Sequence, residues 1–74
     1  MQTLNYTVGP WHAEALLEEV EPGKLMAVIS VTDDKGIAMH DSKHTVVFDH
    51  EQGQDKAKET EQLVRHLLQE RYGV

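Results

Sequence analysis

The sequence of 74 residues contains no cysteine, and this absence removes several classes of protein at once. There are no disulfide bonds, no thiol nucleophile and no thiolate ligands for a metal ion. Small extracellular domains usually depend on disulfides, so a chain of this size without them is expected in a reducing compartment. We therefore expect a soluble cytoplasmic protein.

The chain also lacks a long hydrophobic run. No apolar stretch approaches the roughly 20 residues that cross a bilayer, and the first five residues, Met1–Asn5, do not resemble the start of a signal peptide. No membrane segment is expected.

Basic and aromatic residues are scarce. Thirteen acidic side chains stand against seven basic ones, and the formal net charge of -6 repels a phosphate backbone. One Trp, two Tyr and one Phe are too few for a base-stacking platform. This composition argues against nucleic-acid binding.

The length sets the size of the fold. A chain this small hides only roughly 60% of its unfolded surface, so its core is thin. Residues 1–74 are therefore expected to form a single small α+β domain.

The C-terminal segment from Gln54 to Tyr72 is predicted to be an amphipathic helix. Asp55 is a suitable N-cap after Gly53, and Gly73 provides a stop. The residues of its predicted buried face recur at three- and four-residue spacing: Ala57, Thr60, Leu63, Val64, Leu67, Leu68 and Tyr72.

The segment Leu25–Thr32 is predicted to be the central strand, because it is rich in β-branched residues and ends at the turn sequence Asp33-Asp34-Lys35-Gly36. Its apolar residues occur on both parities, with Leu25 on one and Met26 on the other. Both faces of this strand are therefore expected to be at least partly covered, one by the helix and the other by a second subunit.

Two further segments complete the predicted sheet. His44–Asp49 has the composition of a strand, with Met39–Lys43 as an irregular approach. Trp11–Val20 has the propensity of a helix, but the turn sequence Pro22-Gly23 before the central strand favours a hairpin. The predicted fold is an antiparallel sheet of three strands, with four strands as the alternative, and one C-terminal helix, in β-β-β-α order. The alternative order is α-β-β-α, which resembles double-stranded RNA-binding domains.

The order of these features resembles that of small uncharacterised bacterial β-β-β-α proteins. The resemblance rests on Tyr6 and Gly9 near the start, a hairpin with its turn at Gly23, a strand that ends near Phe48, and the helix. The helix-prone stretch Ala13–Val20 departs from it. Because such proteins have no assigned active site, the resemblance implies no functional residues.

A histidine-rich stretch is the candidate metal site, with His40, His44, His50 and Asp49 as ligands and Asp41 as an alternative oxygen donor. Imidazole and carboxylate are ligands that zinc and nickel accept. On one strand, however, His44 and His50 lie about 20 Å apart, so a shared ion requires a turn between them. No resident cofactor is predicted.

Catalysis is conceivable at Ser42 with His40 or His44, which lie close to it in sequence. A chain with one sheet and one helix has little volume for a substrate cleft, and we expect no enzyme.

The leading functional prediction is a small protein-interaction module that self-associates through its sheet. Its predicted surface joins Met26 and Val28 with Val46 and Phe48, or with Val47, on the face away from the helix. Trp11 is a further candidate anchor, although a ring that covers one end of the core is the alternative. A histidine-based metal- or ligand-binding domain is the second prediction, and a nucleic-acid-binding module is the third.

Overall fold

The computed structural model describes residues 2–73, with the side chains of residues 39–41 excepted. Its elements in chain order are β1 (Gln2–Val8), β2 (Trp11–Glu21), β3 (Lys24–Thr32), β4 (Ala38–Asp49) and the helix α1 (Lys56–Tyr72). The strands form one antiparallel sheet in the order β1-β2-β3-β4. The α+β class is confirmed, with four strands rather than three before the helix.

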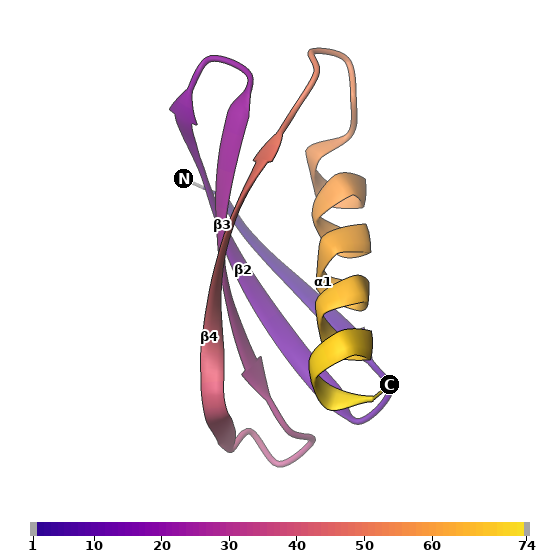
Figure 1. Cartoon of the computed structure of the whole chain (residues 1–74). Coiled ribbons are helices and arrows are strands. Elements are labelled where there is room, and N and C mark those ends of the chain that lie inside the picture. Colours follow the sequence, from indigo (N-terminus) through magenta and orange to yellow (C-terminus); the bar gives the residue numbers. More distant parts are fainter. Residues whose placement is uncertain (1, 74) are drawn as a thin grey trace.

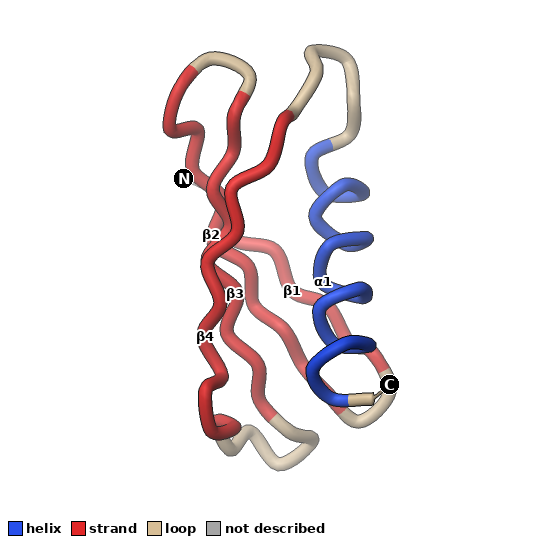
Figure 2. The backbone as a smooth tube through the Cα atoms, in the orientation of Figure 1, coloured by secondary structure: helices blue, strands red, loops and turns tan. Residues whose placement is uncertain are grey.

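The fold has two layers. The sheet is twisted, and α1 runs along one side of it (Figures 1 and 2). The start of α1 lies at the end of the sheet that carries the β2–β3 turn, and the end of α1 lies beside the β1–β2 turn (Figure 1). One face of the sheet is therefore covered by the helix and the other is not.

The ambiguous segment Trp11–Val20 is a strand, and the α-β-β-α alternative is wrong. Its side chains alternate between the buried Ala13, Ala15 and Leu17 and the exposed Glu14 and Glu18. Hydrogen bonds to β1 on one side and β3 on the other outweigh the helical propensity of the segment. The turn before β3 has the expected form, because the φ of 81° at Gly23 is what the third position of a type II turn requires.

Two strand boundaries differ from the expectation. Gln2–Val8 forms β1, whose alternate residues Leu4, Tyr6 and Val8 pack toward the core. β4 begins at Ala38 and not at His44, so the segment predicted as irregular belongs to the strand. A register shift between Ser30 and Thr32 on β3 accommodates this early start.

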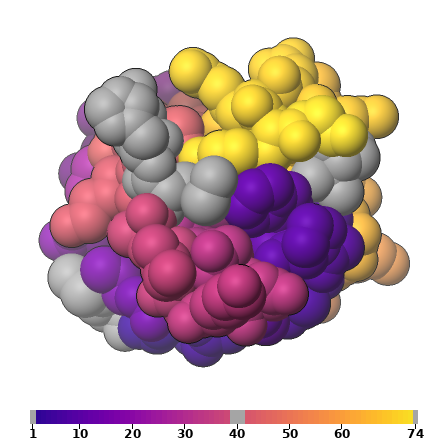
Figure 3. Space-filling model, turned by 90° about the horizontal axis from the view of Figure 1, so that it is seen from below, coloured from indigo at the N-terminus to yellow at the C-terminus, as the bar shows by residue number. Residues whose placement is uncertain are grey.

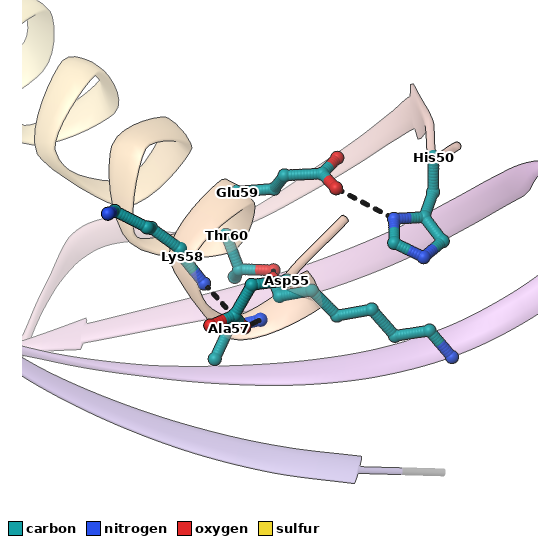
Figure 4. Close-up of polar contacts among 7 residues, drawn as sticks. His50, Asp55, Ala57, Lys58, Glu59 and Thr60 are labelled. Atoms are coloured by element: carbon teal, nitrogen blue, oxygen red, sulfur yellow. Dashed lines mark hydrogen bonds and ion pairs between the residues drawn. The ribbon is translucent and has the colours of Figure 1, made fainter. Parts of the chain in front are cut away.

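The helix begins and ends as predicted. The Asp55 carboxylate accepts hydrogen bonds from the backbone N–H groups of Ala57 and Lys58, as Figure 4 shows. Gly73, with a φ of 69°, provides the left-handed residue that ends the helix. Over the described part of the chain, no helix is long and apolar enough to cross a membrane.

The core lies between α1 and the sheet. Val64 and Leu68 of the helix are fully buried, and small side chains on the sheet let the helix approach closely. The hydroxyl of the buried Thr60 donates to the carbonyl of Lys56 at 2.8 Å, so this polar group is satisfied. The core cluster consists of Val8, Ala13, Ala15, Leu17, Ala27, Ile29, Val31, Val64 and Leu68.

Tyr6 connects β1 to the first turn of the helix. Its hydroxyl donates a hydrogen bond to the carbonyl of Ala57 at 2.7 Å. Burial raises the pKa of the Tyr6 phenol, and the negative charges of Glu61 and Asp55 raise it further. The neutral phenol is therefore the form that the folded state favours.

We predict that Leu68→Ala removes a large part of the stability of the domain. Truncation of a fully buried leucine costs about 2–5 kcal/mol, whereas a domain of this size has a free energy of unfolding on the order of 5–10 kcal/mol. Urea denaturation measures the loss, with the exposed neighbour change Gln69→Ala as the control. Equal midpoints for the two variants would contradict the packing described here.

We also predict an alkaline effect at Tyr6. Because its pKa in the folded state exceeds the unfolded value of about 10, its contribution is fully present below pH 10. It is lost as the pH rises through the folded pKa. Tyr6→Phe should lower the free energy of unfolding by about 1 kcal/mol near pH 7. Above pH 10, the difference in free energy of unfolding between this variant and the unmodified protein should become smaller. Urea denaturation of both proteins from pH 7 to above pH 10 measures this difference. A difference that does not change with pH would contradict the link between the ionisation of Tyr6 and stability.

Candidate interaction surface

The uncovered face of the sheet carries an apolar patch. Strand alternation turns Leu16 of β2, Met26 and Val28 of β3, and Val47 of β4 away from the helix. The first three side chains are half-buried by their neighbours, and Val47 is 54% exposed. These four residues are called the apolar patch below.

The register places the four side chains next to one another. Leu16 lies opposite Val28 across the β2–β3 pair, and Met26 lies opposite Val47 across the β3–β4 pair. Both of the β3 residues lie between the other two, so the patch is centred on β3. Thr3 and Thr45 flank the Leu16–Val28 pair on the outer strands.

The predicted surface is corrected for two residues. Met26 and Val28 lie on the uncovered face as expected, and Val47, which was the alternative, lies beside Met26. Val46 and Phe48 pair with the buried Ala27 and Leu25 and therefore face the helix, where they pack against the core. The reason is the two-residue period of a strand, in which neighbouring residues point to opposite faces.

Trp11 packs on the helix side of the sheet. Its ring centroid lies 5.1 Å from that of Tyr72, with the two planes tilted by 39°. The contact joins the start of β2 to the last turn of α1, the end of the molecule that Figure 3 shows with the helix in yellow beside the indigo N-terminal residues. Trp11 thus covers one end of the core, which is the alternative given for it above.

The proposed metal ligands occupy separate places. His44 Nε2 lies 3.3 Å from the Tyr72 hydroxyl, near the end of α1, whereas His50 Nδ1 lies 2.7 Å from Glu59 Oε1, near its start (Figure 4). Asp49 pairs with Lys24 at 2.8 Å. The side chain of His40 lies outside the described residues, so a metal site that includes it stays a prediction. Among the side chains that are described, no three His, Asp or Glu groups are placed to hold a metal ion.

Charged side chains surround the apolar patch. Glu14 and Glu18 on β2 and Lys43 on β4 are exposed on the uncovered face. At the edge of this face, the hydrogen bond between Lys24 and Asp49 lowers the pKa of the Asp49 carboxyl and raises that of the Lys24 amine. In the row that contains both Glu14 and Lys43, the acidic group thus lies on the β2 side of the patch and the basic group on the β4 side.

A shallow polar hollow of about 310 Å³ lies on the same face, beyond the patch. Its lining includes Glu14 and Ser30, and the hydroxyl of Thr7 lies 3.2 Å from Nδ1 of His12. The uncovered face is therefore apolar toward the β2–β3 turn and polar toward the β1–β2 turn.

Leu16 is not among the residues of the predicted surface. Once Trp11–Val20 is a strand, the alternation of Leu16 with Ala15 and Leu17 places Leu16 on the face opposite the helix. The favoured hairpin interpretation therefore already contained this signal, which the helical propensity of the segment obscured.

Comparisons with protein-family models, with curated proteins and with solved structures give no match to this chain.

Two glutamates of α1 pair with histidines, Glu59 with His50 and Glu70 with His66. We predict that the loss of the first pair lowers the stability of the domain more than the loss of the second. Glu59→Ala leaves His50, whose side chain is only 10% exposed, without its partner and should cost about 1 kcal/mol. Loss of a negative charge from the first turn adds to this cost. Glu70→Ala removes the partner of His66, which is 67% exposed, and should change the stability by less than about 0.5 kcal/mol. Urea denaturation compares the two; equal losses would show that the His50–Glu59 contact does not hold the helix.

Proposed function

We propose that this chain is a non-enzymatic protein-interaction module that self-associates through the uncovered face of its sheet. The observation that carries the proposal is the apolar patch, four apolar side chains that the chain's own helix does not cover. Burial of such side chains is favourable by roughly 25 cal/mol for each Å² removed from water. A patch at the centre of an otherwise polar face is typical of an interaction site.

A second copy is the occupant that fits this face best. Glu14 on β2 and Lys43 on β4 lie in one row of the face, on either side of β3, so this row is complementary to itself. A second copy would also enlarge the thin core of a small domain, which is a common route to stability at this size.

The same proposal places the module in the cytoplasm, because the chain has no cysteine. It also includes the resemblance to small uncharacterised bacterial proteins, whose β-β-β-α order is extended here by the N-terminal strand β1.

We predict that Val28→Lys abolishes self-association. Val28 lies at the centre of the patch, and a charge there would have to be desolvated in the contact. The control is Ile37→Lys, which introduces the same charge at an aliphatic side chain that is 60% exposed on the β3–β4 connection. Sedimentation equilibrium from micromolar to millimolar protein measures the average mass.

The unmodified protein and Ile37→Lys should approach the mass of a dimer, and Val28→Lys should stay monomeric. Circular dichroism checks that Val28→Lys remains folded. A monomeric unmodified protein at millimolar concentration, or a Val28→Lys variant that still dimerises, would overturn the proposal.

A further inference from the structure

On the uncovered face, the residues that lie opposite one another on neighbouring strands form rows across the sheet. Charged side chains occupy fixed places in these rows. A charged row contains Asn5, Glu14, Ser30 and Lys43, from β1 to β4. The next row contains Thr3, Leu16, Val28 and Thr45, and the row after it contains Glu18, Met26 and Val47. In the charged row, the acid and the base stand on either side of β3, one strand away from it.

We propose that two copies pack face to face about a two-fold axis that runs along β3, with Glu14 of each copy facing Lys43 of the partner subunit. This inference rests on the proposed function, since it specifies the geometry of the same contact. β3 would lie over β3 of the second copy, and β2 would lie over β4.

The geometry follows from the symmetry. An axis parallel to the strands keeps each residue at the same level along the strand, so each row meets the same row of the other copy. Val28 then meets Val28 of the partner subunit, and Leu16 meets Thr45 of the partner subunit. Met26 likewise meets Met26 of the partner subunit, whereas Val47 meets Glu18 of the partner subunit. The apolar contact of this arrangement is therefore concentrated on β3.

The charges select this axis over the other face-to-face arrangement. An axis across the strands, through the Leu16–Val28 row, would set the charged row against the row that contains Glu18. Glu14 would then face Glu18 of the partner subunit, and two like charges would be brought together away from water. The axis along β3 instead sets Glu14 against Lys43 of the partner subunit on each side of the contact. The like charges that this axis brings together lie in the row of Glu21, Lys24 and Asp49, at the exposed end of the sheet, where water and salt screen them.

The outer strand β1 supports the same arrangement. With the axis along β3, the contact covers β2, β3 and β4 and leaves β1 outside. The β1 residues Thr3, Asn5 and Thr7, which lie on the uncovered face, are all polar. The apolar part of the face thus coincides with the strands that the contact would cover.

The expected contact is small. Three strands at about 4.8 Å spacing and nine residues at about 3.3 Å give a flat area of roughly 430 Å² on each copy. The total, roughly 900 Å², lies at the low end of specific interfaces. We therefore expect a weak dimer with a dissociation constant in the micromolar range or above.

A charge-exchange experiment tests the geometry. Glu14→Lys alone and Lys43→Glu alone each place like charges at both contacts of the dimer and should weaken it by about tenfold. A mixture of the two variants forms a heterodimer in which both contacts pair an acid with a base. The mixture, and the single chain that carries both changes, should regain the dissociation constant of the unmodified protein by sedimentation equilibrium.

Net charge cannot explain a weaker dimer of the Glu14→Lys variant. Glu14→Lys changes the formal charge from -6 to -4, because it adds two units, and lower net charge favours association. The control Glu70→Lys makes the same change at an exposed site on the helix and should not weaken the dimer. A weaker dimer for Glu14→Lys alone therefore reports the local contact.

The other outcomes are distinguishable. A stronger dimer for Glu14→Lys would assign the axis across the strands, since the introduced lysine would then face Glu18 of the partner subunit, and would overturn the inference. Unchanged association in both single variants would also overturn it, and a loss of association in Val28→Lys would leave the proposed function intact. If Val28→Lys still dimerises, the uncovered face is not the interface and both proposals fail.

Discussion

One helix can cover only one face of a sheet, and this limit shapes the whole molecule. A helix is about 10 Å across, and a four-stranded sheet is about 19 Å wide, so even the covered face depends on close packing. Ala13, Ala15 and Ala27 are buried with Val64 and Leu68 because their small side chains let the helix approach the strands. The larger partly buried side chains then close the sides of the core.

The helix is attached at both ends by polar and aromatic contacts, and these contacts explain several residues that looked functional in the sequence. At the start of α1, Tyr6 donates to Ala57 and His50 pairs with Glu59. At its end, Tyr72 packs on Trp11 and meets His44. His44 on β4 and His50, the residue after its end, each contact one end of the helix, which is a structural reason for these two histidines.

Most of the fold could be predicted from local signals. The errors concern features that depend on how the strands pair with one another. The helix with its caps and the turn at Gly23 were predictable because each depends on a few adjacent residues. β1 was not located, because its alternation of Leu4, Tyr6 and Val8 with polar residues is short. Val46 and Phe48 were assigned to the wrong face because a shift of one residue in register reverses every side chain of a strand. The patch was accordingly found in part, at Met26 and Val28.

β3 carries apolar side chains on both of its faces, although the helix covers only one face of the sheet. A strand with one solvated face needs apolar residues on a single parity, yet Met26 and Val28 add a second set to β3. Pairing at the open edges, β1 or β4, would bury backbone groups but not these side chains, and it would allow further copies to add at each edge. The proposed packing about an axis along β3 would bury them and would close after two copies, because each uncovered face is used once. The proposed dimer would be a helix–sheet–sheet–helix sandwich in which β3 of one copy lies over β3 of the other.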